Sequence, residues 1–363
     1  MAEPFKNFFN KELVASIAKT ISKESKSFDK NEFIKKVLDK DWEARELKER
    51  MRHISLSLNE VLNRPYHESL KILTRIAPKF NGFAVMSFID FVEVFGMDSY
   101  KESVEALGNL TQFASSEFAV RPFIIKYPDK MMKQMLKWSK DKNPHLRRLA
   151  SEGSRPRLPW AMALPAFKKD PSPILPILEN LKDDESEYVR KSVANNLNDI
   201  SKDNPELVLN IVKKWKGKSK NTDWILKHAS RSLLKNGNPK ALEIFGVSSK
   251  ININVAGLKI SRKKIKIGES NEFSFTIQSK EKKDVNLRLE YFVHYMKANG
   301  SLSKKIFKIS ETKYSPNEKR EITRKHSFAD NSIRKHRPGE HKISIVCNGV
   351  EKATISFELI KQS

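Results

Sequence analysis

Cysteine is almost absent from the sequence, since Cys347 is the only one in 363 residues. No disulfide can form within the chain, and metal sites built from several thiolates are excluded within one chain. Long apolar runs are missing too: nothing at the N-terminus forms a signal-peptide core, and no stretch approaches the roughly 20 apolar residues of a membrane span. We therefore expect a soluble cytoplasmic protein that does not associate with membranes.

Several catalytic motifs are also missing. The sequence contains no Walker phosphate loop, no GxGxxG after a strand, no HExxH and no GxSxG, and its eight histidines lack the spacing of metal ligands. These absences argue against a nucleotide-dependent enzyme, a metalloenzyme and a serine hydrolase. We expect no cofactor and no metal, so any catalysis must rely on carboxylates and aromatic side chains.

Basic side chains are in large excess. Lys and Arg number 69 against 44 Asp and Glu, which gives a formal net charge of +25 and an isoelectric point near 9.8. Such an excess favours a polyanionic partner, with nucleic acid first and an anionic membrane surface second. A basic soluble protein without such a partner is the plain alternative.

The first 245 residues carry the apolar periodicity of helices. The segment 47–62 repeats apolar side chains at steps of three and four, which predicts one buried helix face. The segments 145–153, 188–199 and 224–237 can be superposed with offsets of 43 and 36 residues, close to the period of HEAT-type repeats. We expect an α-solenoid of HEAT-like helical repeats over 1–247; an ordinary helical domain is the alternative.

After about residue 250 the apolar period changes to two, which predicts short strands. The segments concerned are 263–279, 284–296, 304–310, 340–349 and 353–360. Their spacing predicts a β-sandwich over 251–363. This segment contains 24 basic residues and 12 acidic residues. Several basic clusters are expected near turns, where they could meet a phosphate backbone, unless they merely form a solvated rim. The predicted fold class is thus a multidomain α plus β protein.

Three acidic residues are candidates for one site. In the predicted helix 188–200, Asp199 lies on a polar strip beside the apolar face, and the superposition places Glu152 on the corresponding strip one repeat earlier. Glu117 lies 35 residues before Glu152, and Trp160 follows in the proline-rich stretch 152–167. Each acid alone is more often a surface ion-pair partner, and a lone tryptophan is more often core.

Carboxylates inside a DNA-binding groove oppose phosphate binding, so we expect them to serve a reaction. Cleavage of an N-glycosidic bond suits them, because positive charge develops on the sugar in the transition state. A base that is already cationic through alkylation can depart without a general acid. Trp160 could stack on the damaged base or its sugar.

The residues also resemble a known family. The run 145–215 with 222–246, and above all its motifs EGSRPRLPW and RKSVANNLND, is similar to the AlkC branch of the DNA alkylation repair glycosylases, which are HEAT-like-repeat enzymes related to AlkD. Some members carry a C-terminal immunoglobulin-like domain, which matches the strand-rich half. The resemblance implies a monofunctional hydrolase of base excision repair that removes 3-methyladenine and 3-methylcytosine from bent double-stranded DNA. It implies catalytic roles for Glu117, Glu152, Trp160 and Asp199.

Basic residues of the repeats are candidates for phosphate contacts or for ordering the loop. Those predicted to bind DNA are Arg147, Arg148, Arg155, Arg157, Arg190, Lys191, His228 and Arg231. The alternative for each arginine is an ion pair with an acid of the next repeat. We expect a monomer in the bacterial cytoplasm or nucleoid, with damaged DNA as partner and no obligate protein partner. A non-enzymatic DNA-binding scaffold and a protein-binding adaptor are the competing interpretations.

Overall fold

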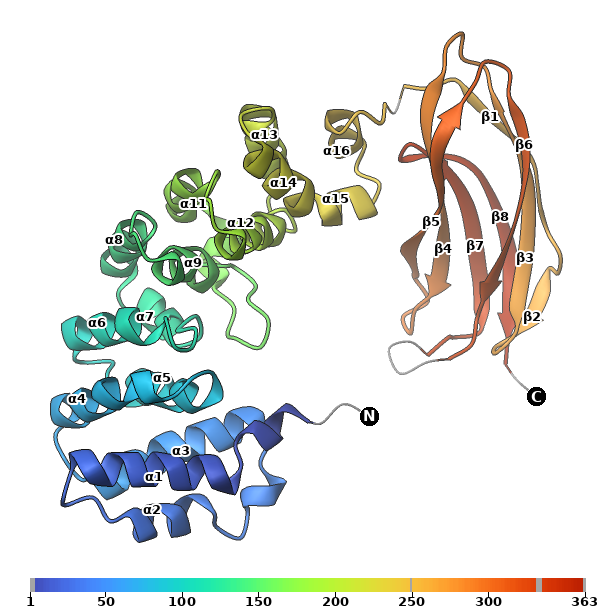
Figure 1. The fold of residues 1–363 in the computed structure, drawn as a ribbon. Helices are drawn as coiled ribbons and strands as arrows, with labels where there is room; N and C mark the ends of the chain where they lie inside the picture. Colours follow the sequence, from blue (N-terminus) through green and yellow to red (C-terminus); the bar gives the residue numbers. More distant parts are fainter. Residues whose placement is uncertain (1–3, 249, 331–334, 362–363) are drawn as a thin grey trace. The chain divides into compact units, whose positions relative to one another are not determined.

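The computed structural model describes residues 4–248, 250–330 and 335–361. The chain divides into two compact units, Met1–Val208 with Lys214–Ala229 and Leu209–Lys213 with Ser230–Ser363. The first unit is helical and the second is mainly β-sheet (Figure 1). This order confirms the predicted fold class, a helical repeat region followed by a β-rich domain.

The helices of the chain are short, as expected of stacked repeats. Their bounds are α1 Lys11–Glu24, α2 Lys30–Val37, α3 Leu47–Leu62, α4 Tyr66–Ile76, α5 Phe83–Phe95, α6 Tyr100–Leu110, α7 Val120–Lys126, α8 Pro128–Trp138, α9 Pro144–Gly153, α10 Pro165–Lys169, α11 Leu175–Leu181, α12 Glu187–Ile200, α13 Pro205–Trp215, α14 Lys220–Ala229, α15 Arg231–Lys235 and α16 Pro239–Ile244. A 3₁₀ turn at Phe5–Phe8 precedes α1.

Polar residues and prolines start many of these helices. The side chain of Asn143 accepts a hydrogen bond from the backbone N–H of His145, and Pro144 follows at the first helical position of α9. Asp29 caps α2 in the same way. An oxygen at this position satisfies a helix N–H that has no partner within the helix, and proline has no N–H to satisfy. The Asn-Pro pairs of the sequence therefore mark helix starts.

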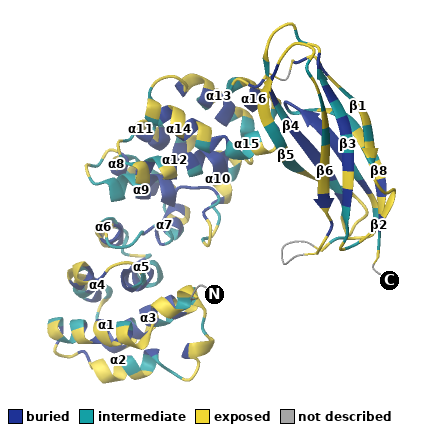
Figure 2. Ribbon diagram, turned by 45° about the vertical axis from the view of Figure 1, so that its right-hand side comes forward, coloured by how far each residue is buried: buried dark blue, intermediate teal, exposed yellow. Residues whose placement is uncertain are grey.

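The helices of the first unit stack in two rows. Along one row α4 contacts α6 and α8 contacts α11, while along the other α3 contacts α5 and α12 contacts both α9 and α14. Figure 1 shows α5, α7, α9, α12 and α14 on the inner row of this unit. Buried residues face the neighbouring helices and exposed residues face outward (Figure 2). We call the surface of α3, α5, α7, α9, α12 and α14 the inner face.

The segment 224–237 differs from the expected continuous repeat. The helix is interrupted at Ser230, so that α14 and α15 are separate. The two helices belong to different compact units. Because helical periodicity continues across the interruption, the apolar pattern could not reveal it.

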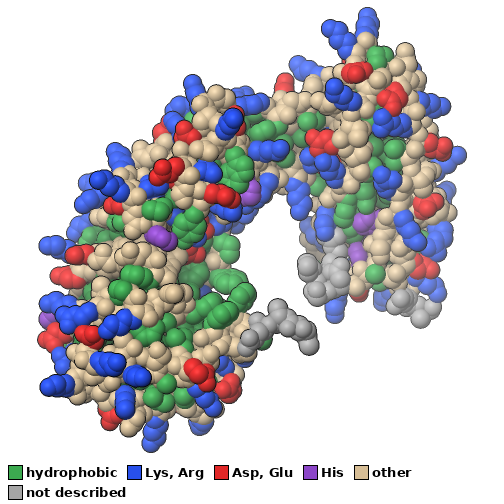
Figure 3. Space-filling model, viewed as in Figure 1, with side chains coloured by type: hydrophobic (Ala, Val, Ile, Leu, Met, Phe, Trp, Pro, Cys, Tyr) green, Lys and Arg blue, Asp and Glu red, His purple; other side chains and the backbone are tan. Residues whose placement is uncertain are grey.

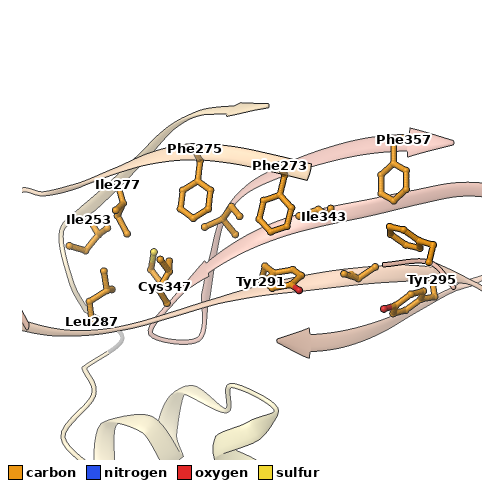
Figure 4. Close-up of a cluster of buried hydrophobic side chains, with 14 of the residues drawn as sticks. Ile253, Phe273, Phe275, Ile277, Leu287, Tyr291, Tyr295, Ile343, Cys347 and Phe357 are labelled. Carbon is orange, nitrogen blue, oxygen red and sulfur yellow. The ribbon is translucent and has the colours of Figure 1, made fainter. Parts of the chain in front are cut away.

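Within the described residues, the β-sandwich has eight strands in two sheets. They are β1 Ile253–Ile260, β2 Lys264–Lys266, β3 Ser270–Ser279, β4 Val285–Met296, β5 Leu302–Tyr314, β6 Lys319–Ser327, β7 Gly339–Cys347 and β8 Val350–Ile360. One sheet has the order β1-β3-β6 and the other β2-β8-β7-β4-β5. Phe273, Phe275 and Ile277 of the first sheet pack against buried side chains of the second (Figure 4).

Two strands, β1 and β6, were not predicted. β6 is the basic stretch expected near a turn, and it pairs along its length with β3. Only His326 of β6 is buried. Charged residues occupy most of its positions, so the sequence does not show the alternation of apolar and polar residues that indicates a strand. β6 lies at the edge of its sheet, and its basic residues Lys319, Arg324 and Lys325 are exposed.

Helices α15 and α16 pack with the strands in the second unit. A methyl group added at Gly349 would lie 2.5 Å from the carbonyl oxygen of Gly237, and the amide of Asn348 donates to the carbonyl of Ser248. The predicted domains, 1–247 and 251–363, stay a prediction. Their boundary lies between the last helix, α16, and the first strand, β1. Within the described ranges, no helix is long and apolar enough to cross a bilayer.

We predict that Gly96→Ala destabilises the first unit. A methyl group at Gly96 would lie 2.2 Å from the hydroxyl oxygen of Tyr66 and 2.4 Å from that of Ser103, which are hydrogen-bonded to each other. Overpacking of this kind costs about 1–3 kcal/mol of unfolding free energy. Urea unfolding measures it, and adding Tyr66→Phe should restore part of the stability. Equal stability of Gly96→Ala and the parent would contradict this packing.

Candidate active site

A loop of irregular backbone crosses between α9 and α10 on the inner face. Residues 154–164 contain no helix, in agreement with the prolines of this stretch. The N–H of Leu164 donates to the carbonyl of Pro156, and Leu158 and Leu164 are buried. The stretch that carries Glu152, Arg155 and Trp160 is therefore a folded loop.

The side chain of Arg121 in α7 anchors the backbone of this loop. Its guanidinium is fully buried and donates to the carbonyl oxygens of Gly153 (3.0 Å), Arg155 (2.8 Å) and Met162 (2.7 Å). Burial, together with the charge of Arg155, lowers the pKa of Arg121 to about 10. Only a planar guanidinium presents several donors in a fixed geometry, so one side chain holds both ends of the loop.

The three predicted acids come together beside this loop. Glu117 lies in the turn before α7, Glu152 at the end of α9 and Asp199 near the end of α12. Glu152 and Asp199 are 5% and 1% exposed. The superposition of repeats predicts that Glu152 and Asp199 share one surface. In the structure, these two acids and Glu117 belong to one network of ion pairs.

Arg155 connects two of the acids. Its Nη1 donates to Glu152 Oε1 at 2.7 Å and its Nε to Asp199 Oδ2 at 2.8 Å. Burial alone would lower the pKa of Arg155, but Glu152 and Asp199 outweigh it and raise the pKa above its ordinary value. Lys202 donates to the other oxygen of Asp199 at 3.0 Å. Arg155 is thus a charged bridge inside the protein.

Arg148 holds the third acid. It donates to Glu117 at 2.7 Å, approaches Glu152 to 3.6 Å and lies 4.6 Å from the centre of the Tyr188 ring. Burial would lower its pKa, but the two carboxylates raise it. Ser115 also donates to Glu117. Three cations, Arg148, Arg155 and Lys202, therefore balance three carboxylates; we call these six residues the ion-pair cluster.

One buried carboxylate oxygen of the cluster receives no hydrogen bond from the described residues. Glu152 Oε2 is buried, and no donor reaches it among the described residues. A buried acceptor without a donor costs free energy, and such groups gather at sites that bind something. Glu152 therefore keeps a buried acceptor that a ligand could satisfy.

A pocket of about 430 Å³ opens beside the cluster. Its lining combines the charged residues Lys48, Glu117, Glu152, Arg148 and Arg155 with the aromatic residues Phe9, Phe83, Phe118, Trp160 and Tyr188. Asp199 does not line it, because Arg155 lies in between. In Figure 3 hydrophobic side chains gather at the inner edge of the helical unit, over α5, α7 and the loop after α9.

Trp160 lines this pocket and is 68% exposed. Its backbone is left-handed, with φ of 61°, a conformation that costs a residue with a side chain roughly 1–2 kcal/mol. Lys48 of α3 donates a hydrogen bond to its carbonyl oxygen. A strained and exposed tryptophan held in this way is typical of a ligand-contacting residue.

The residues predicted to bind phosphate have protein partners. Arg147 pairs with Asp184 of the next repeat, as the alternative interpretation held, and Arg190 donates to the carbonyls of Asp184 and Glu185. Arg157 pairs with Asp203 and remains 38% exposed. Their phosphate contacts stay predictions.

The remaining predicted contacts lie elsewhere. Lys191 pairs with Glu187 at the surface of α12. His228 stacks on Trp224 in α14, and Arg231 begins α15 in the second unit, half-buried. No group of three or more possible metal ligands was found within the part of the chain that the structure describes.

Sequence reasoning missed Arg121, Lys48, Lys202 and Tyr188. A signal existed for Arg121, because a single arginine in the apolar stretch FAVRPFII can only be buried if its donors find partners. Lys48 and Trp160 are 112 residues apart, and no periodicity connects them.

Comparisons with known proteins agree with this architecture. Residues 14–233 match the family described as DNA alkylation repair enzyme, and residues 254–361 match the family described as uncharacterised protein YhaZ, C-terminal Ig-like domain. The chain belongs to the DNA alkylation repair enzyme family. A relative in Bacillus subtilis strain 168, called uncharacterized protein YhaZ, is 47% identical over 98% of this chain and 99% of its own.

A solved structure of an alkylation repair enzyme is also similar over the whole chain. It is the Pseudomonas fluorescens alkylpurine DNA glycosylase AlkC, bound to DNA containing an abasic site analog. It is 36% identical, covers 99% of both chains and superposes with a TM-score of 0.85. The resemblance identified from the motifs is thereby confirmed, as is the combination of an alkylation repair domain with an immunoglobulin-like one.

We predict that Arg121→Lys loosens the loop of this family member. A lysine ammonium cannot reach three carbonyls in the same plane, and an unsatisfied buried carbonyl costs about 1–3 kcal/mol. Urea unfolding should show a decrease of about 2 kcal/mol in unfolding free energy. Arg75→Lys, which alters an exposed ion pair with Glu24, is the control and should unfold like the parent. Unchanged stability of Arg121→Lys would contradict the anchoring role.

Proposed function

We propose that the protein is a monofunctional DNA glycosylase that hydrolyses the N-glycosidic bond of small cationic N-methylated bases, 3-methyladenine and 3-methylcytosine. The observation that carries the proposal is the buried ion-pair cluster beside an exposed tryptophan, in a chain of the alkylation repair family. Membership of the family and the similarity to an alkylpurine glycosylase support a glycosylase; the choice of bases is our proposal.

In the proposed reaction the C1′–N bond breaks and its electron pair goes to the base, which leaves neutral because it was cationic. Positive charge then lies on the deoxyribose, and water adds to C1′ and gives up a proton. Carboxylates aimed at this charge favour the transition state over the ground state. Glu152 is best suited, since it lines the pocket and its buried Oε2 receives no hydrogen bond from the described residues. Glu117 lines the same pocket, and Trp160 can contact the base or the sugar.

Asp199 acts in this proposal through Arg155. Its carboxylate lies behind the guanidinium rather than in the pocket, so it is a positioning residue unless Arg155 moves when DNA binds. Arg148 and Arg155 hold the acids in place and offset their mutual repulsion. A site arranged in advance in this way needs no reorganisation as charge develops.

The proposed substrate is damaged double-stranded DNA, opened at the lesion by bending rather than by full rotation of the nucleotide. The inner face carries the pocket, and Arg157 of the loop, paired with Asp203 but 38% exposed, is a candidate phosphate contact. The β-sandwich would add phosphate contacts through its basic strands, chiefly β6. We propose that the protein acts as a monomer without a cofactor or an obligate protein partner.

The proposal is tested with methylated duplex DNA. We predict that the protein releases 3-methyladenine and 3-methylcytosine, identified by mass spectrometry, and that Glu152→Gln lowers the single-turnover rate about 100-fold or more by removing charge from the site. Glu105→Gln, an exposed acid of α6, is the control and should keep the parent rate. Circular dichroism verifies that both variants fold.

The same experiment separates the competing functions. A DNA-binding scaffold would bind the duplex with a salt-dependent affinity and release no base. An adaptor for proteins would show no salt-sensitive affinity for DNA. Release by Glu152→Gln at the parent rate would disprove the catalytic role of Glu152.

We predict that neutralising Lys319, Arg324 and Lys325 to Gln weakens DNA binding. All three are exposed on β6, and removing one phosphate contact reduces the slope of log affinity against log salt by about 0.9. The matched control neutralises Lys101, Lys133 and Lys137 of α6 and α8, which are exposed on the outer row. Equal salt slopes for the two triple variants would mean that β6 contributes only general charge.

A further inference from the structure

Exposed aromatic rings gather where the N-terminal turn meets the loop after α9. Phe5 and Phe8 are 57% and 55% exposed, and Trp160 is 68% exposed. Phe83 at the start of α5 lies between Phe8 and the pocket and is half-buried. We call Phe5, Phe8, Phe83 and Trp160 the aromatic rim. Single exposed apolar residues are ordinary, but a contiguous group indicates a binding surface.

The rings of the aromatic rim contact one another. Phe8 stacks on Phe83 with ring centres 4.6 Å apart and planes inclined by 14°. Phe5 lies 6.2 Å from Phe8 in a stacked arrangement and 6.2 Å from Trp160 in an edge contact. Three segments far apart in the sequence thus form one surface, and Phe5, Phe8 and Trp160 each remain more than half exposed.

The N-terminal turn is fixed in this position. Phe9 is fully buried, and Arg50 of α3 donates to the carbonyl oxygens of Phe9 (3.0 Å) and Lys6 (3.3 Å). Lys6 pairs with Glu46 at 3.1 Å. The turn is therefore held by α3, and the exposure of Phe5 and Phe8 is a property of a structured element.

The aromatic rim continues the candidate pocket. Phe83 and Trp160 line the pocket together with Glu117 and Glu152. A ligand that brings one group to the acids therefore presents its adjoining parts to the rim. Two features of such a ligand follow: it has flat apolar faces, and it is large enough to extend from the pocket to Phe5.

We propose that Phe5 and Phe8 stack on a nucleobase that loses its stacking partner when the duplex opens at the lesion. The proposal rests on the proposed function, since it assumes DNA in the pocket. Aromatic rings are the side chains that hold unstacked bases, because every base has a flat π face, and the strongly basic chain favours DNA over an apolar protein partner. Phe5 and Phe8 are DNA-contacting residues that keep the duplex open, and they take no part in breaking the bond.

Photochemical crosslinking tests the contact directly. The full-length protein is irradiated with duplexes that contain an abasic-site analogue and 5-iodouracil, placed opposite the analogue or in either flanking position. We expect a crosslink to Phe5 or Phe8 in at least one duplex, identified by mass spectrometry. Crosslinks confined to other residues in all three duplexes would overturn the proposal.

Affinity for the same duplexes gives the second readout. Phe5→Leu with Phe8→Leu keeps the apolar bulk and removes the rings, and we expect binding to weaken about 10-fold, the scale of one base–aromatic stack. Phe5→Tyr with Phe8→Tyr should bind like the parent. Ile125→Ala alters an exposed apolar residue of α7 and serves as control. If the double leucine variant unfolds, Phe5→Leu alone replaces it, because Phe5 lies at the outer end of the rim.

The outcomes distinguish the two proposals. Base release at the parent rate together with unchanged affinity of the leucine variants overturns the aromatic contact and leaves the glycosylase intact. A crosslink to Phe5 or Phe8 without any base release by the parent leaves the contact and rejects the glycosylase. Loss of a dimer in the leucine variants, seen by sedimentation with DNA binding unchanged, would assign the rim to a second copy of the chain and overturn the proposal.

Discussion

The bridge that Arg155 forms between Glu152 and Asp199 is the interaction on which the rest of the site depends. Carboxylates from two neighbouring repeats approach one guanidinium, and these ion pairs offset much of the cost of burying both acids. Because Arg155 lies in the loop, its backbone must be placed accurately, and Arg121 does so by holding the carbonyls on either side. Two arginines therefore stabilise the site. Arg121 holds the backbone of the loop, and Arg155 compensates the charges of the two acids.

The solenoid explains how such a site arises. Each repeat supplies a helix to the inner face, so side chains separated by one repeat become neighbours across adjacent helices. The loop after α9 adds what a regular helix cannot present, an exposed Trp160 with a left-handed backbone. Lys48 and Phe5, both from the N-terminal part of the chain, contact this tryptophan.

Much of the site followed from periodicity. The helix 188–200 was predicted with its buried face, and the offset between repeats placed Glu152 and Asp199 on a common surface. Periodicity could not indicate how their charges are balanced. Arg155 looked like a phosphate ligand in the sequence, whereas the structure buries it between two acids. From sequence alone, an arginine near acids and prolines can be assigned either to a phosphate contact or to an ion pair with a carboxylate. Its N–H donors suit both groups equally.

The two-part architecture, the basic character and the three candidate acids can be predicted from the sequence, because hydrophobic period, composition and motif spacing are local properties of the chain. The position of Asp199 behind Arg155, the buried Glu152 oxygen without a donor and the contact of Phe5 with Trp160 are visible only in the folded chain. These contacts join residues up to 155 positions apart. Their formation depends on the packing of several repeats at once, and no local pattern encodes it.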